Sequence, residues 1–260
     1  MLRLACRIAW LPAILFLPLA VLAQERSWQE ARSTHFKVFY KNATPAELEE
    51  LTHKAEGCYD SIAEQFGFNR FNFWTWDNRA RIYLYDSHDE YVQATRGYSW
   101  SGGQVMAGSK IIQSYVKAPG FLHSILPHEL AHIIFMEMVG FNNPAVPLWL
   151  HEGVATYQEK NTYSSVKAEL AAKMRKGEYL DLDALNRLDL RSADRDQVDL
   201  FYTESYTLVK FLISEFGKDF FVSFCRDLRD YRDLAGSLRR VYSFKSLRDF
   251  QEAWKKYILR

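Results

Sequence analysis

The sequence is poor in cysteine and has almost no net charge. Three cysteines occur in 260 residues, and Cys6 lies near the N-terminus, which leaves Cys58 and Cys225 in the rest of the chain. Such a pair can form a disulfide in an oxidising compartment or stay as two thiols. The 33 basic residues nearly balance the 32 acidic ones, for a formal charge of +1. A chain this close to neutral has no electrostatic basis for binding nucleic acid.

Long apolar runs are also scarce, and the most prominent one lies at the N-terminus. It spans Ile8–Ala23 and follows the basic residues Arg3 and Arg7, and its small final residue fits the rule for signal-peptide cleavage. Its 16 residues are fewer than the roughly 20 that a membrane-spanning helix needs. We therefore expect residues 1–23 to be a cleaved signal peptide and the remainder to be exported, to the periplasm or outside the cell. An uncleaved membrane anchor is the alternative.

What the chain does contain is a short motif of metal-ligand type. Residues 128–132 read His-Glu-Leu-Ala-His. On an α-helix, positions four apart lie about 40° apart, so His128 and His132 can direct two ring nitrogens at one metal ion. Glu129 lies about 100° from His128, which suits contact with a water on the metal better than ligation.

The residues around this motif favour a helix. Phe121–Val139 is apolar and helix-compatible, and Gly140 is its predicted end. Pro127 either opens the motif helix or kinks a longer one.

A third ligand is needed, because catalytic zinc usually has three protein ligands and a water. Trp149-Leu150-His151-Glu152-Gly153 supplies a carboxylate on a second predicted helix, from Pro147 to about Lys160. The loop at 141–146 is rich in turn formers and can fold this helix back, so that Glu152 faces the two histidines. Glu159, two helical turns beyond Glu152, is a weaker rival for the ligand role.

Other third-ligand patterns do not fit. A scheme with a third histidine needs Gly at 135 and His at 138, where this chain has Phe135 and Met138. Glu137 lies about 180° round the helix from His128, so it faces away from the metal.

These motifs resemble those of the gluzincin metallopeptidases, especially the aminopeptidase-N-like and peptidase MA-like groups. The first is His128–His132, and the second is Trp149–Ala155, which matches Trp-Leu-x-Glu-Gly-x-Ala. A third segment, Tyr202–Leu212, is similar to the helix that carries the transition-state tyrosine of the family, and the register places that tyrosine at Tyr202. With motif support, the resemblance covers about residues 120–215.

The sequence departs from the aminopeptidase pattern at two places. His151 stands where aminopeptidase-N-like enzymes commonly have Asn. The amine-binding pattern Gly-x-Met-Glu-Asn is absent, and residues 103–108 are the segment most similar to it. Both departures weaken the case for aminopeptidase specificity.

The resemblance implies a zinc metallopeptidase that acts on peptides or proteins. His128, His132 and Glu152 would hold one Zn²⁺, and Glu129 would accept a proton from the metal-activated water. The hydroxyl of Tyr202 would stabilise the oxyanion together with the metal. In the family, an edge strand that precedes the motif helix pairs with the substrate, and the strand predicted at 110–115 occupies that place.

The pattern of elements predicts an α+β, zincin-like (thermolysin-like) domain over residues 24–260. A sheet-bearing N-lobe would span about 27–140 and a helical C-lobe about 145–260, with the cleft between them. Strands are expected at 35–40, 79–85 and 110–115. The expected helices run from a capping box at Thr44 to about Phe66, and over 88–95, 163–176, 182–188, 197–216, 218–231, 234–242 and 246–257.

The sequence thus predicts an exported, zinc-dependent metallopeptidase. A non-catalytic binding domain that keeps the fold is a second hypothesis, although such a domain has no need of Glu129. A membrane-tethered assembly factor that retains residues 1–23 is a third. The sequence gives no indication of the oligomeric state.

Overall fold

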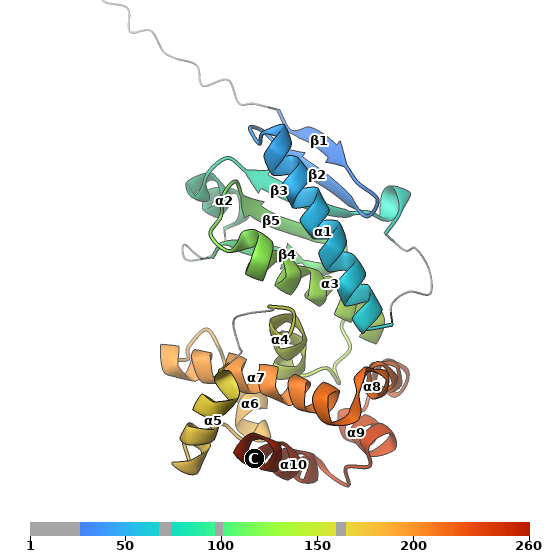
Figure 1. Cartoon of the computed structure of the whole chain (residues 1–260), viewed down its shortest axis with the longest axis vertical. Helices are drawn as coiled ribbons and strands as arrows, with labels where there is room; N and C mark the ends of the chain where they lie inside the picture. Colours follow the sequence, from blue (N-terminus) through green and yellow to red (C-terminus); the bar gives the residue numbers. More distant parts are fainter. Residues whose placement is uncertain (1–26, 68–73, 97–100, 160–164) are drawn as a thin grey trace, which may run out of the picture.

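The computed structural model describes residues 27–67, 74–96, 101–159 and 165–260. In this part of the chain, a sheet-bearing lobe and a helical lobe are joined through two consecutive helices, α3 and α4 (Figure 1). The predicted α+β architecture, with the strands in one lobe and mostly helices in the other, is confirmed. The predicted outer limits of the domain and its lobes stay predictions.

The sheet has five strands in the order β1-β2-β3-β5-β4. The inner strands β2, β3 and β5 are parallel, and the outer strands β1 and β4 run antiparallel to their neighbours. The strands are β1 (Gln29–Arg32), β2 (Phe36–Tyr40), β3 (Ala80–Tyr85), β4 (Gly103–Met106) and β5 (Ile111–Tyr115). The predicted strand at 110–115 is therefore β5, but the expectation that it forms the substrate-pairing edge is wrong. It is paired on both sides, and β4 is the edge strand next to it.

Helices cover the sheet because its inner strands alternate in polarity. Val38, Ile82 and Ile112 are fully buried on one face, against which α1 (Pro45–Gln65) and α3 (Leu126–Val139) pack (Figure 1). On the other face, Tyr85 and Tyr115 contact Tyr91 of α2 (His88–Thr95), at centroid distances of 6.1 and 5.8 Å. Such pairs of apolar faces form the layers of an α+β fold.

The predicted helix starts are confirmed where a cap defines them. The Thr44 side chain accepts from the Glu47 N–H, and the Glu47 carboxylate accepts from the Thr44 N–H at 2.8 Å, which is the predicted capping box. Ser87 caps α2 in a similar way, through the N–H of Glu90.

The motif helix begins irregularly. A π-helical turn over Phe121–Ile125 runs directly into α3, and Pro127 lies in the first turn of α3. Proline has no N–H and cannot complete the regular bonding of the preceding turn. Pro127 thus opens the α-helical part of a longer helical segment, and Gly140 ends it as predicted.

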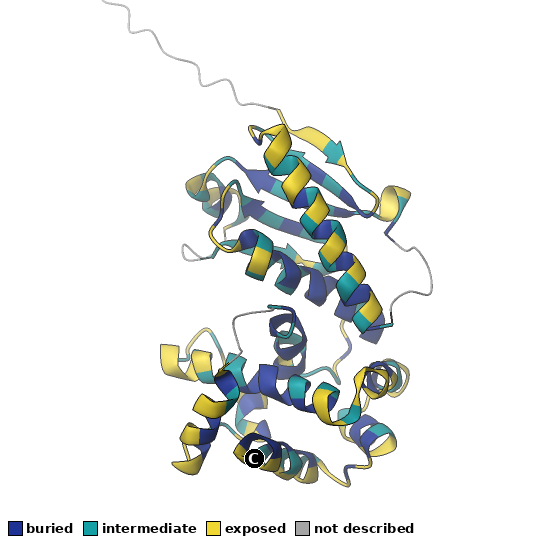
Figure 2. Ribbon diagram, viewed as in Figure 1, coloured by how far each residue is buried: buried dark blue, intermediate teal, exposed yellow. Residues whose placement is uncertain are grey.

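The helical lobe is arranged around α7, which packs on α4 (Figure 1). Its helices are α4 (Leu148–Thr156), α5 (Val166–Arg175), α6 (Leu182–Arg187), α7 (Arg195–Phe216), α8 (Lys218–Tyr231), α9 (Leu234–Tyr242) and α10 (Leu247–Leu259). Buried residues line the inward faces of these helices (Figure 2). The predicted helices of this lobe are confirmed to within a few residues. The exception is α4, which ends at Thr156 rather than near Lys160, and Lys160 itself lies outside the described residues.

The loop between α3 and α4 is fixed by a buried asparagine. The side-chain amide of Asn143 donates to the carbonyl oxygens of Val139, at 2.9 Å, and Leu228, at 3.0 Å. Its side-chain oxygen accepts from the N–H of Ala145. This one residue therefore ties the end of α3 to α8 and sets the direction in which the chain enters α4.

Within the described ranges, none of the helices combines the length and the apolar character that crossing a bilayer requires. The predicted signal peptide lies outside these ranges and stays a prediction. Cys58 lies on α1 and Cys225 is buried on α8, and the structure has no disulfide between these two residues. Burial raises the pKa of the Cys225 thiol.

Candidate metal centre

Two histidines from α3 and one glutamate from α4 converge between the two lobes. The Nε2 atoms of His128 and His132 lie 3.0 Å apart. An Oε2 atom of Glu152 lies 3.6 Å from the Nε2 of His128 and 3.7 Å from that of His132. Among the described residues, these three form the one group of histidine, cysteine and acidic side chains able to hold a metal ion together.

The spacing of these atoms fits a tetrahedral zinc site. Zinc–nitrogen and zinc–oxygen bonds of about 2.0 to 2.2 Å at tetrahedral angles put neighbouring ligand atoms roughly 3.3 Å apart. The three observed separations lie on either side of this value. The donor set of two imidazoles and one carboxylate also suits zinc, and it leaves a fourth position open.

The local sequence explains why α4 presents Glu152 to α3. Trp149, Leu150 and Val154 are buried, and the Trp149 ring stacks on Phe250 of α10 at 6.1 Å. These apolar side chains face the helical lobe. His151 and Glu152 lie on the other side of the helix and face α3.

A glycine allows α4 to approach α7 closely. A Cβ atom at Gly153 would lie 2.9 Å from Val209 Cγ2 and closer still to the carbonyl oxygen of Ser205. Only glycine leaves room for the backbone of α7 at this point. Because Gly153 follows Glu152 directly, the α4–α7 contact fixes the position of the carboxylate as well.

His128 is supported by a second carboxylate. Its Nδ1 atom lies 2.8 Å from Oε1 of Glu159, and Oε2 of Glu159 accepts from the hydroxyl of Ser124 at 2.7 Å. Ser124 belongs to the π-helical turn before α3. Acceptors of this kind orient metal-bound histidines by holding the nitrogen that faces away from the metal.

The weaker alternative, in which Glu159 rather than Glu152 is the ligand, is not the arrangement seen, because Glu159 contacts the Nδ1 atom of His128 and lies outside the cluster of His128, His132 and Glu152. That alternative assumed that α4 continues to residue 160, whereas the helix ends at Thr156 and Glu159 follows in a turn. From there it reaches the outer side of His128. Sequence periodicity gave no signal for this contact, because Glu159 lies beyond the end of α4, where helical spacing no longer applies.

These carboxylates change the protonation of His128 in the metal-free site. Burial alone lowers the pKa of His128, but the carboxylates of Glu152 and Glu159 outweigh it and raise the pKa to about 10. A metal ion must then displace a proton from this ring, which couples metal binding to pH.

Glu129 follows His128 on α3 and is half-buried. Burial raises the pKa of Glu129 to about 7; the charge of His128 opposes this shift and those of Glu152 and Glu159 add to it. A group with a pKa near 7 can both accept and donate a proton at neutral pH, as a general base must. Glu137 faces away, as predicted, and bonds to Lys110 and Trp74.

His132 has a different environment from His128. Its ring stacks on His151 at a centroid distance of 4.3 Å and an interplanar angle of 13°. Its Nδ1 atom is buried and has no hydrogen-bond partner among the described residues. Burial lowers the pKa values of both rings, so both are neutral at pH 7. The sequence alone assigns no task to His151.

Tyr202 lies on α7 and is half-buried. It precedes Ser205, the contact point of α7 with α4, by three residues, which is roughly 4.5 Å along the helix axis. Its role as a donor to the oxyanion stays a prediction.

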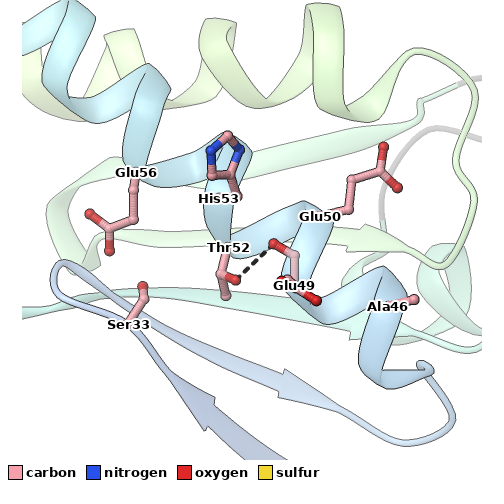
Figure 3. Close-up of a pocket in the computed structure, with 7 residues that line it drawn as sticks. All are labelled: Ser33, Ala46, Glu49, Glu50, Thr52, His53 and Glu56. Atoms are coloured by element: carbon pink, nitrogen blue, oxygen red, sulfur yellow. Dashed lines mark hydrogen bonds between the residues drawn. The ribbon is translucent and has the colours of Figure 1, made fainter.

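A surface hollow of about 610 Å³ lies elsewhere, along the outer side of α1 (Figure 3). It is open and is lined by Ser33, Ala46, Glu49, Glu50, Thr52, His53 and Glu56. None of the residues of the metal centre contributes to it. Of its acidic side chains, Glu49 and Glu50 are exposed, whereas Glu56 is half-buried and accepts from the N–H of His35.

The chain matches one family model and is similar to several solved structures. The model of the Peptidase MA superfamily matches residues 76–260. Among solved structures, yeast LTA4 hydrolase in complex with bestatin is similar to 90% of this chain, with 17% identity and a TM-score of 0.49. Native yeast LTA4 hydrolase is similar to 88% of it, with 16% identity and a TM-score of 0.46. This chain covers 39% and 38% of those two chains. No curated protein sequence matches it.

Proposed function

Because the chain belongs to the Peptidase MA superfamily, we propose that it is an exported zinc-dependent metallopeptidase that hydrolyses peptide bonds. The observation that carries this proposal is the convergence of His128, His132 and Glu152 at zinc-ligand spacing, with Glu129 next to His128 on α3. Export rests on the N-terminal segment alone.

His128, His132 and Glu152 would hold the zinc ion, which would act as a Lewis acid and lower the pKa of a bound water from about 15.7 to near 7. Glu129 then accepts a proton from the attacking water and delivers it to the leaving amine. The hydroxyl of Tyr202 donates to the oxyanion that forms at the scissile carbonyl, a contribution of about 3 to 4 kcal/mol for one well-aimed donor.

A peptide substrate would extend along β4. In the described part of the chain, β4 pairs with a strand on one side only, and it lies next to α3. Its other edge offers main-chain N–H and C=O groups to an extended peptide, which is recognition by β-augmentation. Main-chain pairing tolerates different side chains, so it suits a peptidase that recognises mainly the backbone of its substrate.

The decisive experiment compares Glu129→Gln with the parent in zinc content and in cleavage of a peptide library. We expect the variant to keep zinc and to lose at least about 100-fold in turnover, because a general base contributes 10²–10⁴-fold. Exposed Glu178→Gln is the matched control and should cleave like the parent. Equal cleavage by Glu129→Gln would show that this residue is not the base.

Three further results test the alternatives. Glu152→Ala should lose zinc, and retained affinity would mean that another residue completes the site. A parent that binds zinc fully but cleaves no peptide would favour the non-catalytic binding domain. N-terminal sequencing of the exported protein separates a cleaved form from one that stays tethered to a membrane.

A further inference from the structure

His151 contacts the metal centre without being one of its ligands. It comes from α4, directly before Glu152, and its ring lies between two residues of α3. It stacks on His132 at 4.3 Å and makes an edge-on contact with Phe135 at 6.0 Å and 61°. His132 and Phe135 are one helical turn apart, so the ring of His151 is inserted into the surface of α3.

The two ligand histidines are therefore held by different means. His128 has a carboxylate on the nitrogen that faces away from the metal. For His132 the corresponding atom, Nδ1, is buried, and within the described residues no group accepts a hydrogen bond from it. Without such an acceptor, the orientation of the ring depends on what packs against its faces.

We infer that His151 is a positioning residue that holds His132 in the metal-binding orientation by ring stacking. A flat ring 4.3 Å away and nearly parallel prevents His132 from rotating about its Cβ–Cγ bond. The same insertion fixes α4 against α3, and because Glu152 is the next residue, it also fixes the third ligand. This inference rests on the proposed metal site and gives its second histidine a support that depends on shape rather than on a hydrogen bond.

The test uses a pair of substitutions that separate ring shape from bulk. His151→Phe keeps a flat ring, and His151→Leu fills a similar volume without one. Zinc affinity is measured on the purified full chain by competition with a chelator, and the metal-free Tm is measured alongside. Absorption of the Co²⁺-substituted protein reports whether the ligand geometry is regular.

We expect His151→Leu to weaken zinc binding about 10- to 100-fold, the usual effect of losing the support of a metal ligand, and to broaden the Co²⁺ spectrum. His151→Phe should bind zinc within a few-fold of the parent and keep the spectrum. Unchanged zinc affinity in His151→Leu would overturn the inference, even with a lower metal-free Tm, because a purely structural residue affects folding alone. Equal losses in both variants would overturn it too, since stacking would then not be the cause.

The outcome is independent of the peptidase assignment. A parent that binds zinc but cleaves nothing refutes the proposed hydrolase and leaves the His151 comparison intact. A parent that cleaves peptides while His151→Leu binds zinc normally refutes the positioning role alone.

Discussion

The candidate metal centre lies between two walls, and the two walls differ in how their elements pack at their closest contacts. The sheet-side wall consists of β4, the π-helical turn 121–125 and α3, and the helix-side wall consists of α4 and α7. Each wall has a glycine at a close contact, Gly153 within α4 and Gly102 directly before β4. At Gly153 the neighbouring atoms are the backbone of α7, whereas at Gly102 the nearest atom is the end of the Ile125 side chain. Backbone packed in a helix cannot move aside, but a side-chain terminus can rotate, so the helix-side wall should be the more rigid.

The largest effect is expected for Gly153→Ala. A methyl group there collides with the carbonyl of Ser205, and α4 and α7 must separate. We expect a loss of about 3 kcal/mol or more in the free energy of unfolding, or no folded protein, because the collision can be relieved only by moving the backbone of a packed helix. Urea denaturation of the variant and the parent measures this difference in the free energy of unfolding.

Gly57→Ala is the matched control. Gly57 also lies within a helix, α1, but a Cβ atom there would meet nothing within 4 Å. This substitution should stabilise the chain by up to about 1 kcal/mol, the helix-propensity difference between the two residues. If both variants are equally stable, the close contact of α4 with α7 is not the reason for glycine at 153.

The second effect concerns Glu159, which extends from beyond the end of α4 to a histidine of the opposite wall. Glu159→Ala should weaken zinc binding about 10- to 100-fold, because His128 loses the acceptor on its Nδ1 atom. Ser124→Ala removes only the hydroxyl that holds the carboxylate, so its loss should be smaller. Chelator competition ranks the variants; a larger loss for Ser124→Ala would contradict this order of support.

These residues also show what the sequence could predict. The ligands His128, His132 and Glu152 follow from helical spacing and from one hairpin, and helix caps such as Thr44 follow from local hydrogen bonding. The roles of Glu159, Ser124 and His151 do not follow from the same rules. They depend on a π-helical turn, on where α4 ends, and on the angle between two helices, and all three are set by packing between distant segments.

The third effect concerns the protonation of a buried carboxyl group, that of Glu204, in the helix-side wall. Glu204 precedes Ser205 on α7 and is fully buried; one carboxyl oxygen accepts from the N–H of Leu180 at 2.9 Å. Burial raises the pKa of Glu204 to about 8 from a usual value of 4.5. The folded chain therefore keeps this proton between these two pH values while the unfolded chain releases it. The free energy of unfolding should fall as the pH rises through this window.

Glu204→Gln should remove this dependence, because the amide stays neutral and still offers an oxygen to Leu180. Its stability relative to the parent should increase by about 2.5 kcal/mol from pH 5 to pH 7, because the slope approaches about 1.4 kcal/mol for each pH unit between the two pKa values. Denaturation at several pH values measures the difference, with the exposed Glu178→Gln as control. A difference that stays constant with pH would mean that Glu204 is ionised in the folded chain.

The smallest effect is expected on the sheet-side wall, for Gly102→Ala. The added Cβ would lie 2.5 Å from Cδ1 of Ile125, the far end of a flexible side chain, while the next atoms are 3.9 Å away. Rotation of Ile125 relieves the collision, so we expect a loss of about 1 kcal/mol or less, with zinc affinity unchanged. A loss as large as that of Gly153→Ala would mean that Ile125 cannot rotate, and that the π-helical turn holds β4 as firmly as α7 holds α4.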